Sequence, residues 1–237
     1  SHGSFKYLTQ AQYDEIKGDK LIKDYGLRRF VGMAEEAPFN KSHVEIGYSD
    51  AKQAHWMYCD PIEGRLPAEG TNEAATDTHI LKLLGVEPVI GTSFTLTFDV
   101  DGTKVTKTFT LSGWWEYDTV IKANHVLLPL TRAQEIYDQG GIGDGLGRDE
   151  ITGSWNMDVM LGSTLHIEKD MQSILLNHGY QSENRAEENY IPTGVNWGYT
   201  GTQLEDNIDP MTIVSIIALL LLILFTGYLI IYNIFQI

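Results

Sequence analysis

The C-terminal stretch of this chain restricts its possible fold and location more than any other segment. Residues 211–237 read MTIVSIIALLLLILFTGYLIIYNIFQI and contain no Asp, Glu, Lys, Arg or His. A helix of about 20 such residues crosses the hydrocarbon core of a bilayer. A buried helix of a soluble protein is usually shorter, and a secretory signal lies at the N-terminus with a shorter apolar region. The stretch therefore predicts a transmembrane helix over residues 211–237.

The charges before this helix predict its orientation. No Lys or Arg occurs from Ala186 onward, whereas Glu205, Asp206 and Asp209 precede the apolar stretch. Because positive charge accumulates on the cytoplasmic side, we expect a cell-membrane protein whose residues 1–210 are extracytoplasmic. The chain starts at Ser1 without a signal peptide and is still apolar at Ile237, so we expect a fragment of a longer protein with a further membrane helix upstream.

The charge balance narrows the range of partners. The formal net charge is -15 and the pI is about 4.7, and all charged residues precede residue 211. Such a field repels phosphate backbones, so we exclude nucleic acid as a partner. It also argues against a domain that lies flat on anionic lipid.

Cysteine usage is sparse. Cys59 is the only cysteine, which excludes an internal disulfide and is more typical of a bacterial surface protein than of a small eukaryotic secreted domain. Without a positioned His it lacks the partner of a nucleophile, and we expect a buried, unreactive thiol.

Local patterns predict alternating strands and helices before the membrane segment. Thr9, with Gln12 three residues on, predicts a capped helix over residues 10–17. Asp77 or Thr78 caps a short helix that Gly85 ends, and Asp99 to Gly102 form a hairpin turn. We expect strands ending at residue 8 and over residues 27–33, 44–48, 55–58, 94–98, 105–111, 126–130 and 155–161, a Thr131-capped helix to residue 137, a helix over residues 164–177, and a polar linker at residues 196–203.

Four short motifs follow one another in the middle of the chain. They are G-R-L-P at residues 64–67, N-E at residues 72–73, a short helix ending L-G at residues 84–85, and a strand opened by G-T at residues 91–92. In this order they resemble the extracytoplasmic domain of FtsX/MacB-type ABC transporter permeases. Residues 227–235 are similar to the second membrane helix of large permeases from Gram-positive bacteria. The resemblance begins at Gly64, and this chain departs from it with Ala74 and Ala75 where the family has branched aliphatic residues.

This resemblance implies a fold and a set of structural residues. The expected fold is mixed α/β (α+β): an extracytoplasmic domain of two sub-domains over residues 1–203, a linker at residues 204–210 and one transmembrane helix at residues 211–237. Within the helix, Gly227 and Asn233 favour packing against other membrane helices. The motif residues expected to have structural roles are Gly64, Arg65, Pro67, Asn72, Glu73, Gly85 and Gly91.

The resemblance also implies a function. The domain and helix would relay ATP-driven conformational change to the export or extraction of an amphipathic substrate: a peptide, lipid or lipoprotein. The implied partners are a separate cytoplasmic ABC ATPase subunit and other permease helices or a second permease half. The acidic surface suits cationic peptides.

No constellation of residues predicts catalysis, a metal or a cofactor. Six histidines (His43, His55, His79, His125, His166 and His178) lack metal-ligand spacing. Asp99 and Asp101 lack the twelfth-position Glu of a calcium loop, Ser112 and Ser154 lack a nucleophile elbow, and the glycine-rich residues 140–147 lack a following Lys-Ser/Thr. We therefore expect a non-catalytic permease part. The alternatives are a single-pass membrane-anchored sensor or adhesin and, with least support, a membrane-tethered hydrolase.

Overall fold

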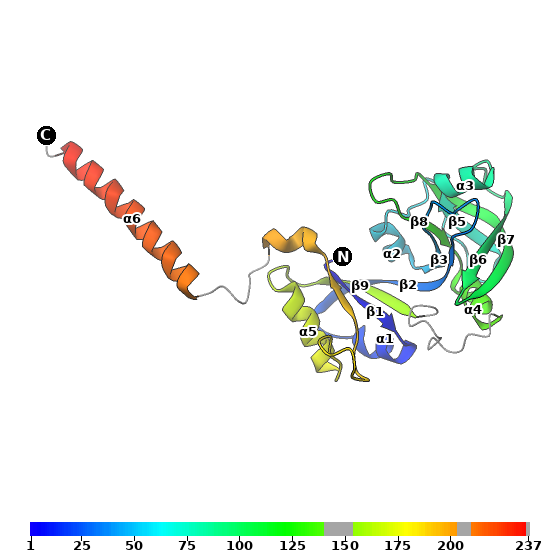
Figure 1. Cartoon of the computed structure of the whole chain (residues 1–237), viewed down its shortest axis with the longest axis horizontal. Helices are drawn as coiled ribbons and strands as arrows, with labels where there is room; N and C mark the ends of the chain where they lie inside the picture. Colours follow the sequence, from blue (N-terminus) through cyan, green and yellow to red (C-terminus); the bar gives the residue numbers. More distant parts are fainter. Residues whose placement is uncertain (140–153, 203–209, 236–237) are drawn as a thin grey trace.

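One sheet organises the domain. The computed structural model describes residues 1–139, 154–202 and 210–235 (Figure 1). Within them the strand order is β10-β1-β9-β2-β3-β8-β5-β7-β4, and β6 pairs with both β2 and β7. The strands are β1 (Gly3–Leu8), β2 (Ile22–Ala34), β3 (Val44–Ser49), β4 (Glu63–Gly64), β5 (Glu73–Asp77), β6 (Ser93–Val100), β7 (Thr103–Trp115), β8 (Asn124–Leu127), β9 (Trp155–Leu161) and β10 (Thr193–Val195).

Helices cover this sheet, so the expected α+β class is confirmed. They are α1 (Gln10–Ile16), α2 (Ala51–Trp56), α3 (Thr78–Leu84), α4 (Leu130–Gln139), α5 (Ile167–Asn177), the 3₁₀ helix η1 (Trp197–Thr202) and α6 (Pro210–Phe235).

Part of the sheet closes on itself. The strand path β2-β3-β8-β5-β7-β6 returns to β2, where Met33 pairs with Asp99. Along β6 buried and exposed residues alternate without exception, so Phe94, Leu96, Phe98 and Val100 point inward. These residues, with Phe109, Ile46 and others, form the larger hydrophobic cluster, which we call the barrel core.

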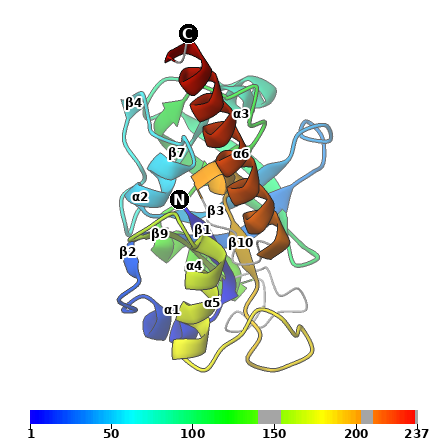
Figure 2. The same ribbon diagram turned by 90° about the vertical axis from the view of Figure 1, so that its left-hand side faces the viewer.

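A second cluster lies beside the closed part, where β9, β1 and β10 extend the sheet. We call it the flank core; α1 and α5 cover it, at the end of the domain away from α3 (Figure 2). Helix α5 buries Ile167, Met171, Ile174 and Leu175, which is the spacing of one helical face. Because β10 runs parallel to β9 with β1 between them, β9-α5-β10 has the predicted strand-helix-strand order.

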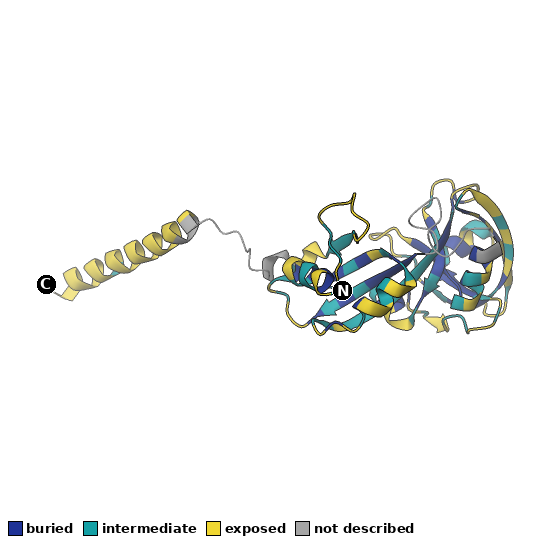
Figure 3. Ribbon diagram, turned by 90° about the horizontal axis from the view of Figure 1, so that it is seen from below, coloured by how far each residue is buried: buried dark blue, intermediate teal, exposed yellow. Residues whose placement is uncertain are grey.

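Helix α6 differs from every other element. Its segment Val214–Phe235 is long and apolar enough to cross a membrane, and none of it is buried (Figure 3). The predicted C-terminal helix is therefore present, with residues 236–237 outside the described part. The predicted linker at residues 204–210 also lies almost wholly outside it.

Several local predictions are confirmed at atomic detail. Thr9 and Gln12 form a complete capping box at the start of α1. Gly85 ends α3 in the left-handed conformation at φ 67°. The β6-β7 hairpin turns at Asp101 and Gly102, whose φ values of 47° and 80° give the two-residue turn that matches strand twist.

The predicted strand at residues 55–58 is wrong. His55 and Trp56 end helix α2, because Asp50 is its N-cap and accepts a hydrogen bond from the backbone N–H of Gln53 at 2.7 Å. The sequence did not predict strand β5. It pairs with β7 and β8 on its two sides, and Ala74 to Asp77 are all buried. A strand buried on both faces shows no alternation.

Three further expectations need correction. Strand β8 ends at Leu127, and α4 already begins at Leu130, so Thr131 is not its cap. Helix α5 begins at Ile167, three residues later than predicted. Residues 197–202 of the predicted linker form η1, where the Tyr199 ring lies 4.9 Å from that of His2. The glycine-rich residues 140–147 lie outside the described part.

Candidate functional site

Most of the motif residues meet at one corner of the sheet, where β4 pairs with β7. We call this the motif corner and define it by Gly64, Arg65, Pro67, Asn72 and Glu73. Gly64 has φ 77°, and a Cβ there would lie 2.2 Å from the carbonyl oxygen of Ser112. Only glycine fits so close an approach of two strands.

A bidentate ion pair closes the motif corner. Arg65 donates to Glu73 through Nη1 (2.8 Å) and Nη2 (2.7 Å), and Glu73 also accepts from the N–H of Ala68 at 2.9 Å. The hydrogen bonds from Arg65 hold the pKa of Glu73 below its ordinary value. Pro67 lies inside the loop so formed. The G-R-L-P turn is thereby fastened to the first residue of β5.

Asn72 extends the corner to β7. Its Nδ2 donates to the carbonyl of Thr108 at 2.5 Å, and its own carbonyl accepts from the N–H of Thr110 at 2.9 Å. Gly91, at φ 89°, donates its N–H to the carbonyl of Leu111 at 2.8 Å. Gly91 therefore bonds to β7, the strand that the motif corner also contacts, whereas Gly85 caps the C-terminus of α3.

One residue of this region was missed by the sequence analysis. Glu69 accepts hydrogen bonds from the backbone N–H groups of Leu130 (2.9 Å) and Thr131 (3.0 Å), and so caps α4 from a distant loop. Thr131 Oγ1 in turn accepts from the N–H of Gly70 at 3.0 Å. Burial opposes ionisation of Glu69, but these hydrogen bonds outweigh it and lower its pKa. Nothing in local spacing indicates a contact across 61 residues.

The two residues predicted to pack in the membrane helix do not share a face. Gly227 and Asn233 are six residues apart, which is about 120° around an α-helix. A Cβ on Gly227 would meet nothing within 4 Å. Asn233 donates from Nδ2 to the carbonyl of Leu229 at 2.9 Å within the helix.

The titratable residues considered for chemistry are dispersed. Among the described residues no group of three His, Cys, Asp or Glu side chains has the geometry of a metal site. His55 contacts Asp60 (2.7 Å) and His178 contacts Asp19 (3.2 Å), in different parts of the domain. Asp99 Oδ1 accepts from the N–H of Gly102 at 2.7 Å and so stabilises the hairpin turn.

Cys59 has the properties expected of an unreactive thiol. It is 1% exposed and packs with Ala54, Ala75, Trp115 and Leu127. Burial raises its pKa to about 12, with the nearby Asp77 acting in the same direction. The thiolate is therefore absent at neutral pH.

A hollow of about 540 Å³ lies beside α5 and β10, and we call it the flank groove. Its charged side chains are Lys6, Glu168 and Glu183. Trp197, at its border, is 70% exposed. The groove thus combines carboxylates with an apolar aromatic surface near the chain's exit toward α6.

Comparison with known proteins gives similarity at the level of structure. No protein-family model and no curated protein matches the sequence. The chain is similar to the extracellular domain of the noncanonic ABC-type transporter YknZ from Gram-positive bacteria, at 14% identity and a TM-score of 0.47, covering 80% of this chain and 89% of that one. It is also similar to "a domain of a putative Permease protein" from Porphyromonas gingivalis, at 12% identity and a TM-score of 0.42, covering 77% and 76%.

Proposed function

We propose that this chain is the extracytoplasmic domain and one membrane helix of an ABC transporter permease of the FtsX/MacB type. The observation that carries the proposal is α6: an apolar helix without buried residues that follows a folded, strongly acidic domain. A bilayer is the medium in which such a surface is stable. The motif corner adds support, because residues that carry the resemblance lie together there: Arg65 pairs with Glu73, and the adjacent Asn72 bonds to β7.

The domain's own role is mechanical. ATP would be hydrolysed by a separate cytoplasmic ATPase subunit. The membrane helices would relay the closure of the ATPase dimer to the domain and so shift the populations of its conformations. The end of the sheet suits such a relay: the edge strand β10 pairs antiparallel with its neighbour β1, and Asn196 Nδ2 donates to the carbonyl of Ser1 at 2.9 Å. The first residues of the domain and its exit toward α6 therefore lie side by side (Figure 1).

The flank groove supports a proposal for the substrate class. Glu168 and Glu183 offer carboxylates and Trp197 an exposed aromatic face, which together suit an amphipathic cationic peptide. The net charge of -15 would draw such a peptide toward the domain over longer distances. Lys6 limits the groove's own negative charge.

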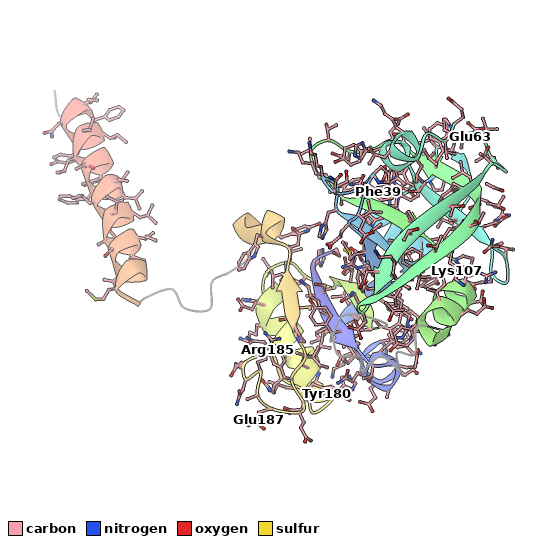
Figure 4. The ribbon with its side chains drawn as sticks, turned by 45° about the vertical axis from the view of Figure 1, so that its right-hand side comes forward. Phe39, Glu63, Lys107, Tyr180, Arg185 and Glu187 are labelled. Atoms are coloured by element: carbon pink, nitrogen blue, oxygen red, sulfur yellow. The ribbon has the colours of Figure 1, made fainter. Side chains whose placement is uncertain are left out.

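Peptide binding to the full chain in lipid nanodiscs tests the substrate class. We expect Glu168→Gln with Glu183→Gln to weaken binding of an amphipathic peptide of net charge about +4 by about fivefold, since each exposed charge pair contributes up to about 1 kcal/mol. The matched control is Glu35→Gln with Glu63→Gln, which changes the net charge equally. Figure 4 shows Glu63 far from Tyr180 and Glu187, which lie on either side of the groove residue Glu183 in the sequence. Equal loss in both variants would remove the groove from the proposal.

The permease assignment has a separate test. The full-length gene should encode further hydrophobic helices beyond this segment and lie beside an ATPase gene. A gene that ends soon after Ile237 with a short basic tail would instead identify a single-pass sensor or adhesin.

A further inference from the structure

Strand β10 forms one end of the sheet and borders the flank groove. Within the described residues β10 ends the strand order, and its strand neighbour is β1 alone. The N–H of Lys6 donates to the carbonyl of Pro192, and the N–H of Asn196 donates to the carbonyl of His2, both at 2.9 Å. These two bonds fix the antiparallel register of β10 on β1.

The backbone groups of β10 alternate between β1 and the open side. In the register just described, Gly194 is paired with Ser4, and its N–H and C=O groups face β1. Those of Thr193 and Val195 therefore point away from β1. Among the described residues these groups have no hydrogen-bond partner. An edge in this state is a template for a further strand.

The two faces of this edge differ in charge. Thr193 is paired with Phe5, which is fully buried in the flank core, so the Thr193 side chain lies on the face that α5 covers. Helix α5 lies beside β10 there and brings Glu168 into the flank groove (Figure 4). Lys6 lies on the other face, where its Cε would be 3.4 Å from a Cβ on Gly194. One face of the edge thus carries a carboxylate and the other an ammonium group.

We propose that the flank groove binds a cationic peptide in extended form, as an additional antiparallel strand on β10. The peptide backbone would bond to the N–H and C=O groups of Thr193 and Val195. An antiparallel direction continues the pairing of β10 with β1 and of β1 with β9. The inference rests on the proposed function and deepens it, because it specifies the conformation and the charge pattern of the peptide.

The geometry determines which peptide residues carry positive charge. In an antiparallel pair, residues directly opposite each other have their side chains on the same face. Peptide residues opposite Thr193 and Val195 would direct their side chains toward Glu168 and their backbone groups toward β10. The residue between them, opposite Gly194, would direct its side chain toward Lys6, which disfavours positive charge there. Charge should therefore recur at every second residue.

Two peptides of equal composition test this pattern by their binding to the full chain in lipid nanodiscs. One is a capped peptide of about eight residues in which Lys and Val alternate, and the other carries the same residues at helical spacing. We expect the alternating peptide to bind at least about tenfold more tightly, since it alone combines the edge hydrogen bonds with charge on the Glu168 face. Equal affinity of the two peptides would overturn the inference.

N-methylation of the alternating peptide tests the hydrogen bonds themselves. Methyl groups on two central Lys amides remove donors that would face β10, and we expect each to weaken binding about twofold to tenfold. Methyl groups on two central Val amides are the matched control; these amides face away from β10, so binding should not change. Equal loss with both sets, or loss with the Val set alone, would overturn the proposed pairing.

Thr193→Pro removes one edge N–H from the protein. Because this N–H faces away from β1, the β1-β10 ladder stays intact, and proline is tolerated on such an edge. We expect binding about twofold to tenfold weaker, whereas Thr193→Val, which keeps the N–H, should bind as the wild type does. Urea unfolding shows whether both variants are folded. If Thr193→Pro is not, the methylated peptides decide, since they leave the protein unchanged.

Glu168→Gln with Glu183→Gln separates this inference from the proposed function. If this variant binds both peptides as the wild type does, the flank groove is not the peptide site, and the proposed substrate class and the strand addition both fail. If it weakens binding of both peptides but N-methylation has no effect, only the strand addition fails.

Discussion

Asp77 is a buried carboxylate whose charge should cost stability at neutral pH. It is 0% exposed; Oδ1 accepts from the N–H groups of His79 (2.9 Å) and Ile80 (3.0 Å), while Oδ2 has no hydrogen-bond partner among the described residues. Burial raises its pKa to about 6 from the ordinary 3.8, although the cap hydrogen bonds act in the opposite direction. The folded state therefore holds a proton between these two pH values that the unfolded state has released.

The sign of the pH effect follows from this difference. Because the folded pKa is the higher one, the contribution of Asp77 to the free energy of unfolding falls as pH rises from about 4 to about 6 and stays low above that. The shift of about two pKa units corresponds to about 3 kcal/mol as an upper bound. Asp77→Asn keeps the capping oxygen and removes the charge, so we expect the variant to gain about 1–3 kcal/mol over the wild type at pH 7.5 and little at pH 4.

Urea unfolding of the full chain in detergent micelles, followed by tryptophan fluorescence from pH 4 to 8, measures the effect. The informative quantity is the difference between variant and wild type, because Asp19 and Glu73, whose pKa values are lowered, give the total curve an opposite slope at acid pH. A difference that does not change with pH, or that favours the wild type more as pH rises, would refute the reasoning.

Three further substitutions test the close backbone approach at Gly64, the cap of α4 and the cation–π contact between the two cores. Gly64→Ala should destabilise the domain by about 2–3 kcal/mol in the same urea assay, and Gly70→Ala by about 1 kcal/mol. Both glycines have positive φ, but only a Cβ on Gly64 would clash with backbone atoms. Glu69→Ala should cost about 1 kcal/mol through the lost cap of α4, and hydrogen exchange should rise at Leu130 and Thr131; unchanged exchange there would contradict the cap. Arg29 lies over the rings of Tyr137 (5.4 Å) and Trp155 (5.2 Å), one from each core, so Arg29→Met should cost about 1–2 kcal/mol, and a neutral effect would remove the cation–π contact from the account.

Local signals were sufficient for much of the fold. The capping box of Thr9, the left-handed Gly85 and the Asp101-Gly102 turn each depend on residues close in sequence, and the structure has them as predicted. The apolar C-terminal helix was equally clear, because its length and composition need no tertiary context. These elements are determined by backbone geometry and side-chain polarity within a few residues.

Elements that depend on distant partners were not predictable in this way. The ring closure through Met33 and Asp99 and the cap of α4 by Glu69 join residues far apart in the chain. Strand β5 lacks alternation because neighbours cover both of its faces, and α2 was hidden because its few residues also fit a strand pattern. At the motif corner the sequence named the residues, but only the structure places Arg65 on Glu73 and Asn72 on β7.

The central claim is an acidic domain outside the cell joined to a helix inside the membrane. Lys104→Cys at the exposed β6-β7 hairpin, in the full-length protein, tests it with a membrane-impermeant maleimide on intact cells, because the native Cys59 is buried. The account predicts labelling without permeabilisation, in protein that resists carbonate extraction. Labelling only after permeabilisation, or release of the protein by carbonate, would contradict it.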